Sequence, residues 1–178
     1  CHNPSYVDKY DMVSDIKPGG AFLLNCGWDV EELSQHLPGK TKAYLAKNHI
    51  RLYTIDGIAI GKEIGLGGRI NTILQSAFFK LSGIIPEADA IKYMKDAALK
   101  SYGSKGDKIV QMNYDAIDRG AKDVKEIPVP ADWADAQGDF VWGKAVGDRK
   151  DLIDFVNDVL IPVSAQKGDS LPVSAFTG

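Results

Sequence analysis

The chain has 178 residues, of which 44% are hydrophobic, so it can bury one substantial core, and its length favours a single domain or one domain with a tail. Lysine and arginine (21) are balanced by aspartate and glutamate (24), which gives a formal net charge of -3. This balance lacks the basic excess that neutralises a phosphate backbone, so we expect no nucleic-acid partner. No apolar run approaches the roughly 20 residues of a membrane span, and we recognise no signal peptide. We therefore expect no membrane association and a cytoplasmic location.

Two cysteines, Cys1 and Cys26, are too few and too far apart for a Cys-x-x-Cys pair, so we expect this chain to hold no metal through thiolates. Free thiols in a reducing cytosol are favoured over a disulfide. Because the sequence starts at Cys1 instead of Met and ends in LPVSAFTG, we expect an excised piece of a longer protein. A mature lipoprotein also starts with Cys, but no Ser/Gly linker follows it here.

The N-terminal part alternates strand and helix signals. A Pro-Gly-Gly turn precedes the apolar run 21–26, which has the length of a buried strand. Asp29 can cap a helix over 30–37, and a second short helix fits 41–49. The β-branched and aromatic run 50–56 predicts another buried strand. Strand, helix and strand in this order imply a right-handed crossover between parallel strands, and so a Rossmann-like, three-layer α/β fold.

Helical patterns follow. A short helix fits 57–65, and an apolar stripe at helical spacing predicts a longer helix that starts near Arg69. The members of this stripe are Ile70, Ile73, Leu74, Ala77, Phe78 and Leu81. We expect Ile73, Leu74 and Phe78 to hold this helix in the core.

Two further helices are predicted next. Pro86 opens a helix that Gly103 ends. The pattern 106–124 predicts the other helix. The side chains expected to face inward are Ile91, Met94, Ala98 and Tyr102 on the first helix and Ile109, Val110, Asn113 and Ile117 on the second.

Prolines after Glu126 restrict their neighbours to extended backbone and remove hydrogen-bond donors. We place a domain boundary near Val129, with a domain over 1–129 and an extended C-terminal strap over 130–178. A helical island is predicted within the strap at 149–162. The three tryptophans are expected to anchor loop and strap by packing; they are Trp28, Trp133 and Trp142.

The glycine cluster at 65–68 raises the possibility of a phosphate-binding loop. A dinucleotide fingerprint requires a third glycine where Ile70 stands, and a Walker loop requires Gly-Lys-Ser/Thr, which is absent. Two interpretations remain. The glycines can expose backbone N–H groups at a helix start beside Arg69, where an anion could bind. They can also simply separate two helices, which the residues alone favour.

Two asparagines could contact a ligand. Asn71 lies in a first helical turn and forms a stripe with Gln75 and Phe79, and Asn113 lies inside a later helix. An amide can both donate and accept, which suits a pantetheine amide, a ribose or an adenine edge. On the residues alone, an ordinary polar helix residue is the favoured interpretation of each. The three histidines and the scattered carboxylates have no catalytic or metal-ligand spacing, so we expect no catalytic residue and no metal ligand in this chain.

The order of these segments resembles the pyruvate:ferredoxin (flavodoxin) oxidoreductase family over essentially the whole chain. The segments that carry the resemblance are 15–38, 64–120, 129–136 and 168–176, with GGRIN and QMN inside the second. The resemblance implies that 1–129 is most of the gamma-type, coenzyme A-associated domain. It also implies that 168–176 opens the connecting domain named after a Glu-Lys-Arg motif, which is not present here.

The resemblance also implies a function. Family members convert pyruvate, coenzyme A and oxidised ferredoxin or flavodoxin to acetyl-CoA, carbon dioxide and reduced carrier, as homodimers. Thiamine diphosphate, Mg and 4Fe-4S clusters are then expected in other domains of the same polypeptide. Asn71 and Asn113 match the family's coenzyme A-contacting asparagines, so this piece is expected to position coenzyme A and to be inactive alone. Two other hypotheses are an interdomain scaffold and, on the glycines alone, an independent nucleotide-binding protein.

Overall fold

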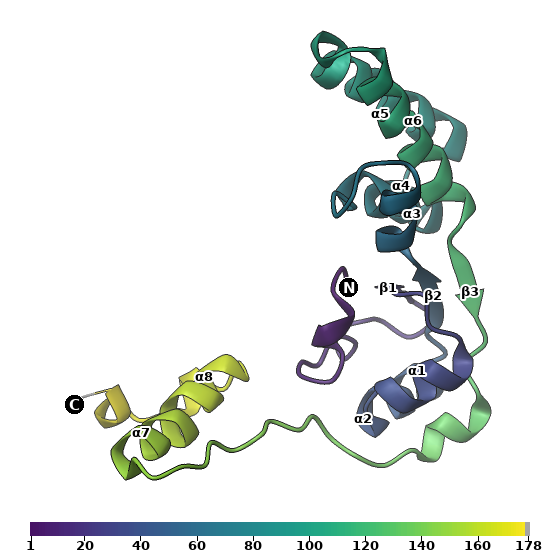
Figure 1. Cartoon of the computed structure of the whole chain (residues 1–178). Helices are drawn as coiled ribbons and strands as arrows, with labels where there is room; N and C mark the ends of the chain where they lie inside the picture. Colours follow the sequence, from purple (N-terminus) through teal and green to yellow (C-terminus); the bar gives the residue numbers. More distant parts are fainter. Residues whose placement is uncertain (177–178) are drawn as a thin grey trace.

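The computed structural model describes residues 1–176, so positions 177 and 178 of the predicted strap lie outside the described residues. Within them, β1 (Ala21–Asn25), β2 (Arg51–Ile55) and β3 (Lys125–Ile127) form one sheet in the order β1-β2-β3 (Figure 1). β1 and β2 are parallel, with Leu23 opposite Tyr53. The expected parallel strands and the Rossmann-like α/β class are confirmed.

β3 pairs antiparallel with β2, and the sequence analysis missed it. The prediction treated the chain from Glu126 on as extended and assigned no strand to it. With only three residues and a mostly exposed surface, β3 has no apolar alternation by which a strand could be recognised. Its hydrogen bonds to β2 place the end of the preceding helix beside the sheet.

The crossover from β1 to β2 contains α1 (Val30–His36) and α2 (Gly39–Lys47). The predicted cap is confirmed: the Asp29 carboxylate accepts from the Glu32 backbone N–H, and the Glu32 carboxylate accepts from the Asp29 N–H. The first core lies between this crossover and the sheet. Its largest fully buried side chains are Leu24, Leu33, Leu45, Leu52 and Val13.

The helical half of the body contains α3 (Gly57–Glu63), α4 (Asn71–Ser82), α5 (Glu87–Tyr102) and α6 (Asp107–Lys122). Figure 1 shows α5 and α6 as a pair that projects away from the sheet, with α4 against their base. A second core lies under α3, α4 and α6. Its members include Ile55, Ile60, Leu66, Ile73, Ala77 and Ala116.

The buried face of α4 differs from the predicted one. Ile73 and Ala77 are fully buried as expected, but Phe78 is 50% exposed, so its predicted anchoring role is wrong. Ser76 instead lies in the contact between α4 and α6, and its hydroxyl donates to the Ile117 carbonyl at 2.6 Å. A small polar residue fits this face because α6 approaches α4 closely, and hydrophobicity alone cannot indicate such an approach.

The glycine cluster forms the turn between α3 and α4. Gly65 and Gly67 have φ angles of +85° and +61°, which side-chain-bearing residues rarely adopt. The Gly67 N–H donates to the Gly61 carbonyl at 2.9 Å and so closes the turn. The interpretation as a break between two helices is confirmed.

The strap begins at a 3-10 turn, Ala131–Asp135, that belongs to the first core. Trp133 in this turn is 4% exposed and packs beside α2. The expected anchoring by tryptophan is therefore confirmed for Trp133, which lies beyond the predicted boundary at Val129. The boundary itself stays a prediction.

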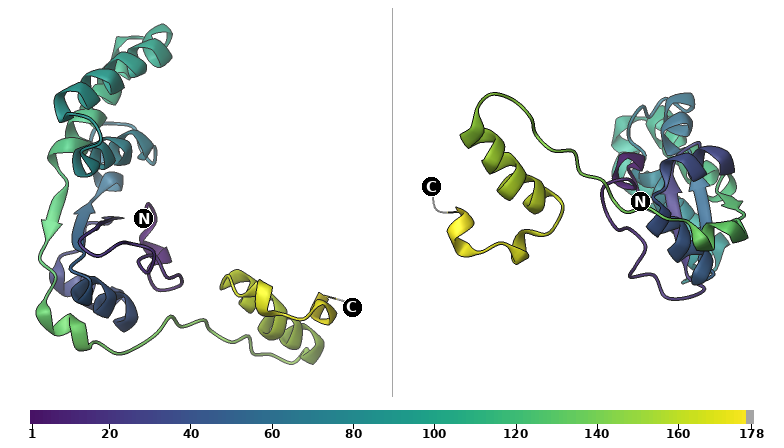
Figure 2. Two further views of the ribbon diagram at one scale, coloured as in Figure 1. Left: turned by 180° about the vertical axis from the view of Figure 1, so that it is seen from behind. Right: turned by 90° about the horizontal axis from the view of Figure 1, so that it is seen from below.

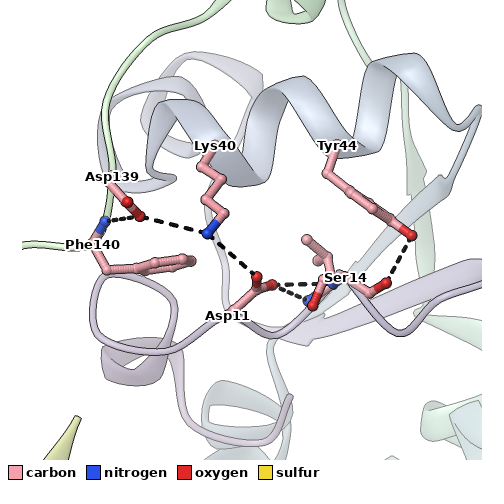
Figure 3. A network of polar contacts seen from close by, with 7 residues as sticks. Asp11, Ser14, Lys40, Tyr44, Asp139 and Phe140 are labelled. Carbon is pink, nitrogen blue, oxygen red and sulfur yellow. Dashed lines mark hydrogen bonds and ion pairs between the residues drawn. The ribbon is translucent and has the colours of Figure 1, made fainter. Parts of the chain in front are cut away.

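The strap then contacts the start of α2. A Cβ added to Gly39 would come within 2.0 Å of the Gln137 carbonyl oxygen, so only glycine allows this approach. Lys40 lies between two carboxylates at 3.9 Å each, Asp11 from the N-terminal segment and Asp139 from the strap (Figure 3). Its Nζ also lies 5.6 Å from the Phe140 ring centroid. These contacts bring together three segments that are distant in sequence.

The later part of the strap forms a helical unit that stands apart from the body (Figure 2). It consists of α7 (Lys150–Phe155), a π-helical turn (Val156–Leu160) and α8 (Ile161–Ser164), so the predicted island at 149–162 is confirmed. Two 3-10 turns, Gly168–Ser170 and Val173–Phe176, complete it. Among the described helices, none is long and apolar enough to cross a bilayer.

Candidate functional site

The candidate site is a cavity between α4, α5 and α6, where the α5–α6 pair diverges from α4. Its volume is about 340 Å³. α4 contributes a polar wall and α5 a wall of small and aromatic side chains. The lining residues are Asn71, Thr72, Gln75 and Phe79 from α4; Ala90, Tyr93, Met94, Ala97, Ala98, Ser101 and Tyr102 from α5; and Ile85 and Asn113.

A smaller hollow of about 90 Å³ lies next to this cavity. Loop residues line it in addition to helical ones. Its lining comprises Leu66, Arg69, Asn71, Thr72, Tyr102, Lys105, Ile109 and Asn113. Four of these also line the larger cavity, so the two hollows meet at Asn71, Thr72, Tyr102 and Asn113.

Asn71 is the first residue of α4, immediately after the glycine turn. Its side chain is exposed and makes no hydrogen bond within residues 1–176. The preceding residue, Ile70, offers no side-chain oxygen to cap the helix. Asn71 therefore presents a free amide to both hollows.

Asn113 reaches the same place from α6 and is only 4% exposed. Its Nδ2 donates to the Ile109 carbonyl at 2.8 Å, which fixes the orientation of the amide. In the part of the chain that the structure describes, its Oδ1 accepts no hydrogen bond. Asn113 lines both hollows, so this oxygen is available to accept from a ligand N–H or O–H.

The fold thus brings together the two asparagines that the sequence analysis selected. Gln75 and Phe79, the other members of the predicted polar stripe, line the larger cavity with Asn71. The role of these residues as ligand contacts stays a prediction. The sequence analysis predicted only part of the α5 wall. It expected Met94 and Tyr102 to face inward, and both line the cavity. It did not select Tyr93, which also lines the cavity although its side chain is 58% exposed.

The lining contains no acid, base or nucleophile other than two tyrosines, one serine and one threonine. Cys26 lies in the first core, away from the cavity, and burial raises its pKa to about 11, so its thiol stays protonated at neutral pH. Across residues 1–176, no three His, Cys, Asp or Glu side chains gather as a metal ion would require. The arrangement can bind and orient a ligand through amides and an apolar wall.

The fold and the cavity therefore define an α/β domain with a candidate ligand-binding cavity in its helical half. The family model described as "Pyruvate ferredoxin/flavodoxin oxidoreductase" matches residues 1–122. The chain belongs to this family.

Named relatives agree with this membership. The chain is 49% identical over 177 residues to the pyruvate:ferredoxin oxidoreductase of Moorella thermoacetica and 48% identical over 178 residues to the pyruvate-flavodoxin oxidoreductase of Enterobacter agglomerans. It is also 40% identical over 197 aligned residues to the pyruvate dehydrogenase [NADP(+)] of Cryptosporidium parvum. These alignments cover 98–100% of the chain but only 15%, 15% and 10% of the respective relatives.

Proposed function

We propose that this chain is the part of a pyruvate:ferredoxin/flavodoxin oxidoreductase that positions coenzyme A, with Asn71 and Asn113 as ligand contacts. One observation carries the proposal. Two asparagines 42 positions apart in sequence (113 minus 71) line the same pair of hollows.

The chemistry of the cavity suits the pantetheine arm of coenzyme A. That arm alternates amides with apolar stretches, and the cavity places asparagine and glutamine amides opposite the apolar wall of α5. To hold the coenzyme A thiol beside its reaction partner, the domain must orient the ligand and keep it in one position. This task requires no nucleophile or base from the domain. A lining without carboxylate, histidine, lysine or cysteine is compatible with that task.

The complete enzyme would convert pyruvate, coenzyme A and oxidised ferredoxin or flavodoxin to acetyl-CoA, carbon dioxide and reduced carrier. A 4Fe-4S cluster does not fit the donor set here, because it requires four thiolates and this sequence has two cysteines. Under this proposal the clusters, and thiamine diphosphate with its Mg, belong to the remaining length of the relatives. Homodimerisation and a cytoplasmic location of the complete enzyme are parts of the same proposal.

A second candidate function is that of an interdomain scaffold, and the C-terminal unit favours it. Phe155, Leu160 and Phe176 are each about half exposed and line an apolar hollow of about 570 Å³ there. Such a surface is typical of a contact with another domain. The two functions are compatible, because the hollow and the asparagine-lined cavity lie on different parts of the chain.

Kinetics of the complete enzyme test the proposal. Asn71→Ala and Asn113→Ala are each expected to raise the KM for coenzyme A about tenfold, because a ligand amide loses its partner in a closed site. The KM for pyruvate should stay unchanged, since neither residue is proposed to contact it.

The matched control is Gln111→Ala, which removes an exposed amide from the same helix, bonded to Asp115 at 2.8 Å. It should leave the KM for coenzyme A unchanged. An unaltered KM for coenzyme A in both asparagine variants would leave only the scaffold function.

A further inference from the structure

The smaller hollow carries positive charge that the body does not neutralise. We propose that Arg69 and Lys105 form a phosphate-binding end of the site and recognise the diphosphate of the ligand. The identity of that ligand as coenzyme A rests on the proposed function above. The recognition of a diphosphate rests on the hollow itself.

The two cations reach the hollow from separate loops. Arg69 ends the glycine turn before α4, and Lys105 ends the 3-10 turn Gly103–Lys105 before α6. Tyr102 and Asn113 line the hollow together with them. Two loops that converge on one concave surface with a cation each can contact one anion from two sides.

Neither cation has an acidic partner within residues 1–176, and no carboxylate lines the hollow. On the adjoining helices, Lys80 is paired with Glu87 and Lys95 with Asp118 at 2.7 Å, whereas Lys100 and Lys108 have no acidic partner within residues 1–176. The Lys105 Nζ has only an aromatic contact, 5.3 Å from the Tyr102 ring centroid. Arg69 and Lys105 are the cations that line this hollow among the described residues.

The backbone adds to this charge. α4 has 12 residues, and its N-terminal end opens at Asn71 and Thr72, which line the hollow. Because Ile70 supplies no side-chain cap, the first-turn N–H groups are not engaged by a side chain. Uncapped N–H groups at the positive end of a helix favour an anion, and here they accompany two unpaired cations.

The division of the site follows from these contacts. The diphosphate would lie against Arg69 and Lys105, and the pantetheine arm would pass Asn71 and Asn113 into the larger cavity along α5. The cations should therefore distinguish phosphorylated from unphosphorylated forms of one ligand. The asparagines should act on both forms.

Calorimetric titration of this chain with coenzyme A, pantetheine and inorganic pyrophosphate tests the proposal. The variant Arg69→Gln/Lys105→Gln should bind coenzyme A and pyrophosphate about tenfold more weakly or worse, with pantetheine binding unchanged. Raising the salt concentration should weaken coenzyme A binding in the wild type more than in the variant. The control Arg51→Gln/Lys47→Gln changes exposed cations outside the hollow and should match the wild type.

The outcomes separate the two proposals. If the wild type binds pyrophosphate and the variant does not, the phosphate site is supported. If, in addition, neither the wild type nor the variant binds pantetheine, the result counts against the coenzyme A assignment. Equal binding of coenzyme A and pyrophosphate by wild type and variant would overturn the phosphate site, as would no pyrophosphate binding by the wild type. Circular dichroism of the variant verifies that it is folded.

Discussion

Gly120→Val is expected to destabilise the helical half of the body by roughly 3 kcal/mol, at the upper end of overpacking effects. A Cβ on Gly120 would come within 2.3 Å of the Ile73 carbonyl oxygen and 2.8 Å of the Ser76 Cβ. The nearest atom is backbone, so no rotamer change relieves the clash and α4 must move away from α6. Thermal unfolding followed by circular dichroism should show a clearly lower Tm.

The control for this substitution is Gly143→Val, where a Cβ would meet no atom within 4 Å. It should leave the Tm nearly unchanged. Since α4 and α6 carry Asn71 and Asn113, a shift of these helices should also weaken coenzyme A binding. A Gly120→Val protein as stable as the control would contradict the close approach of the two helices.

Asn25→Ala is expected to lower the free energy of unfolding by roughly 3 kcal/mol, because it leaves buried polar groups unpaired. Asn25 is 1% exposed, and its Oδ1 accepts from the Gly57 N–H at 2.9 Å. Its Nδ2 donates to the His2 carbonyl at 2.8 Å. The side chain thereby ties the end of β1 to the first residue of α3 and to the N-terminal segment. Urea unfolding should show a lower midpoint at a similar slope.

Gln137→Ala is the matched control, since its amide donates to the Asp135 carbonyl on the exposed strap. We expect a change of at most about 0.5 kcal/mol there. A midpoint for Asn25→Ala as high as that of this control would show that the Asn25 amide does not join the two cores.

The sequence predicted the elements whose signals are local. The Asp29 cap, the apolar runs of β1 and β2 and the glycine turn before α4 each depend on neighbouring residues, and all are confirmed. The errors concern contacts between distant segments. β3 pairs with β2 over only three residues, and Phe78 lies outside the core because Ser76 faces α6.

The site shows the same division between local and distant information. Periodicity placed Asn71, Gln75 and Phe79 on one face of α4, and the resemblance selected Asn71 with Asn113. Neither the periodicity nor the resemblance could show that Asn71 and Asn113 line a common hollow, because the shape of the hollow depends on where α5 lies. The charge of Lys105 could not be related to Arg69 for the same reason: the loops that carry them meet only in the folded chain.

The most direct test of the central claim is a coenzyme A titration of the ¹⁵N-labelled chain, followed by NMR of its backbone and side-chain amides. The side-chain NH₂ signals of Asn71 and Asn113 should shift together with backbone signals of α5. Signals around Trp28 and His36, which stack at 4.1 Å beside another hollow, should not move. Shifts confined to that hollow or to the α7–α8 unit, with both asparagine signals unchanged, would contradict the proposed coenzyme A site.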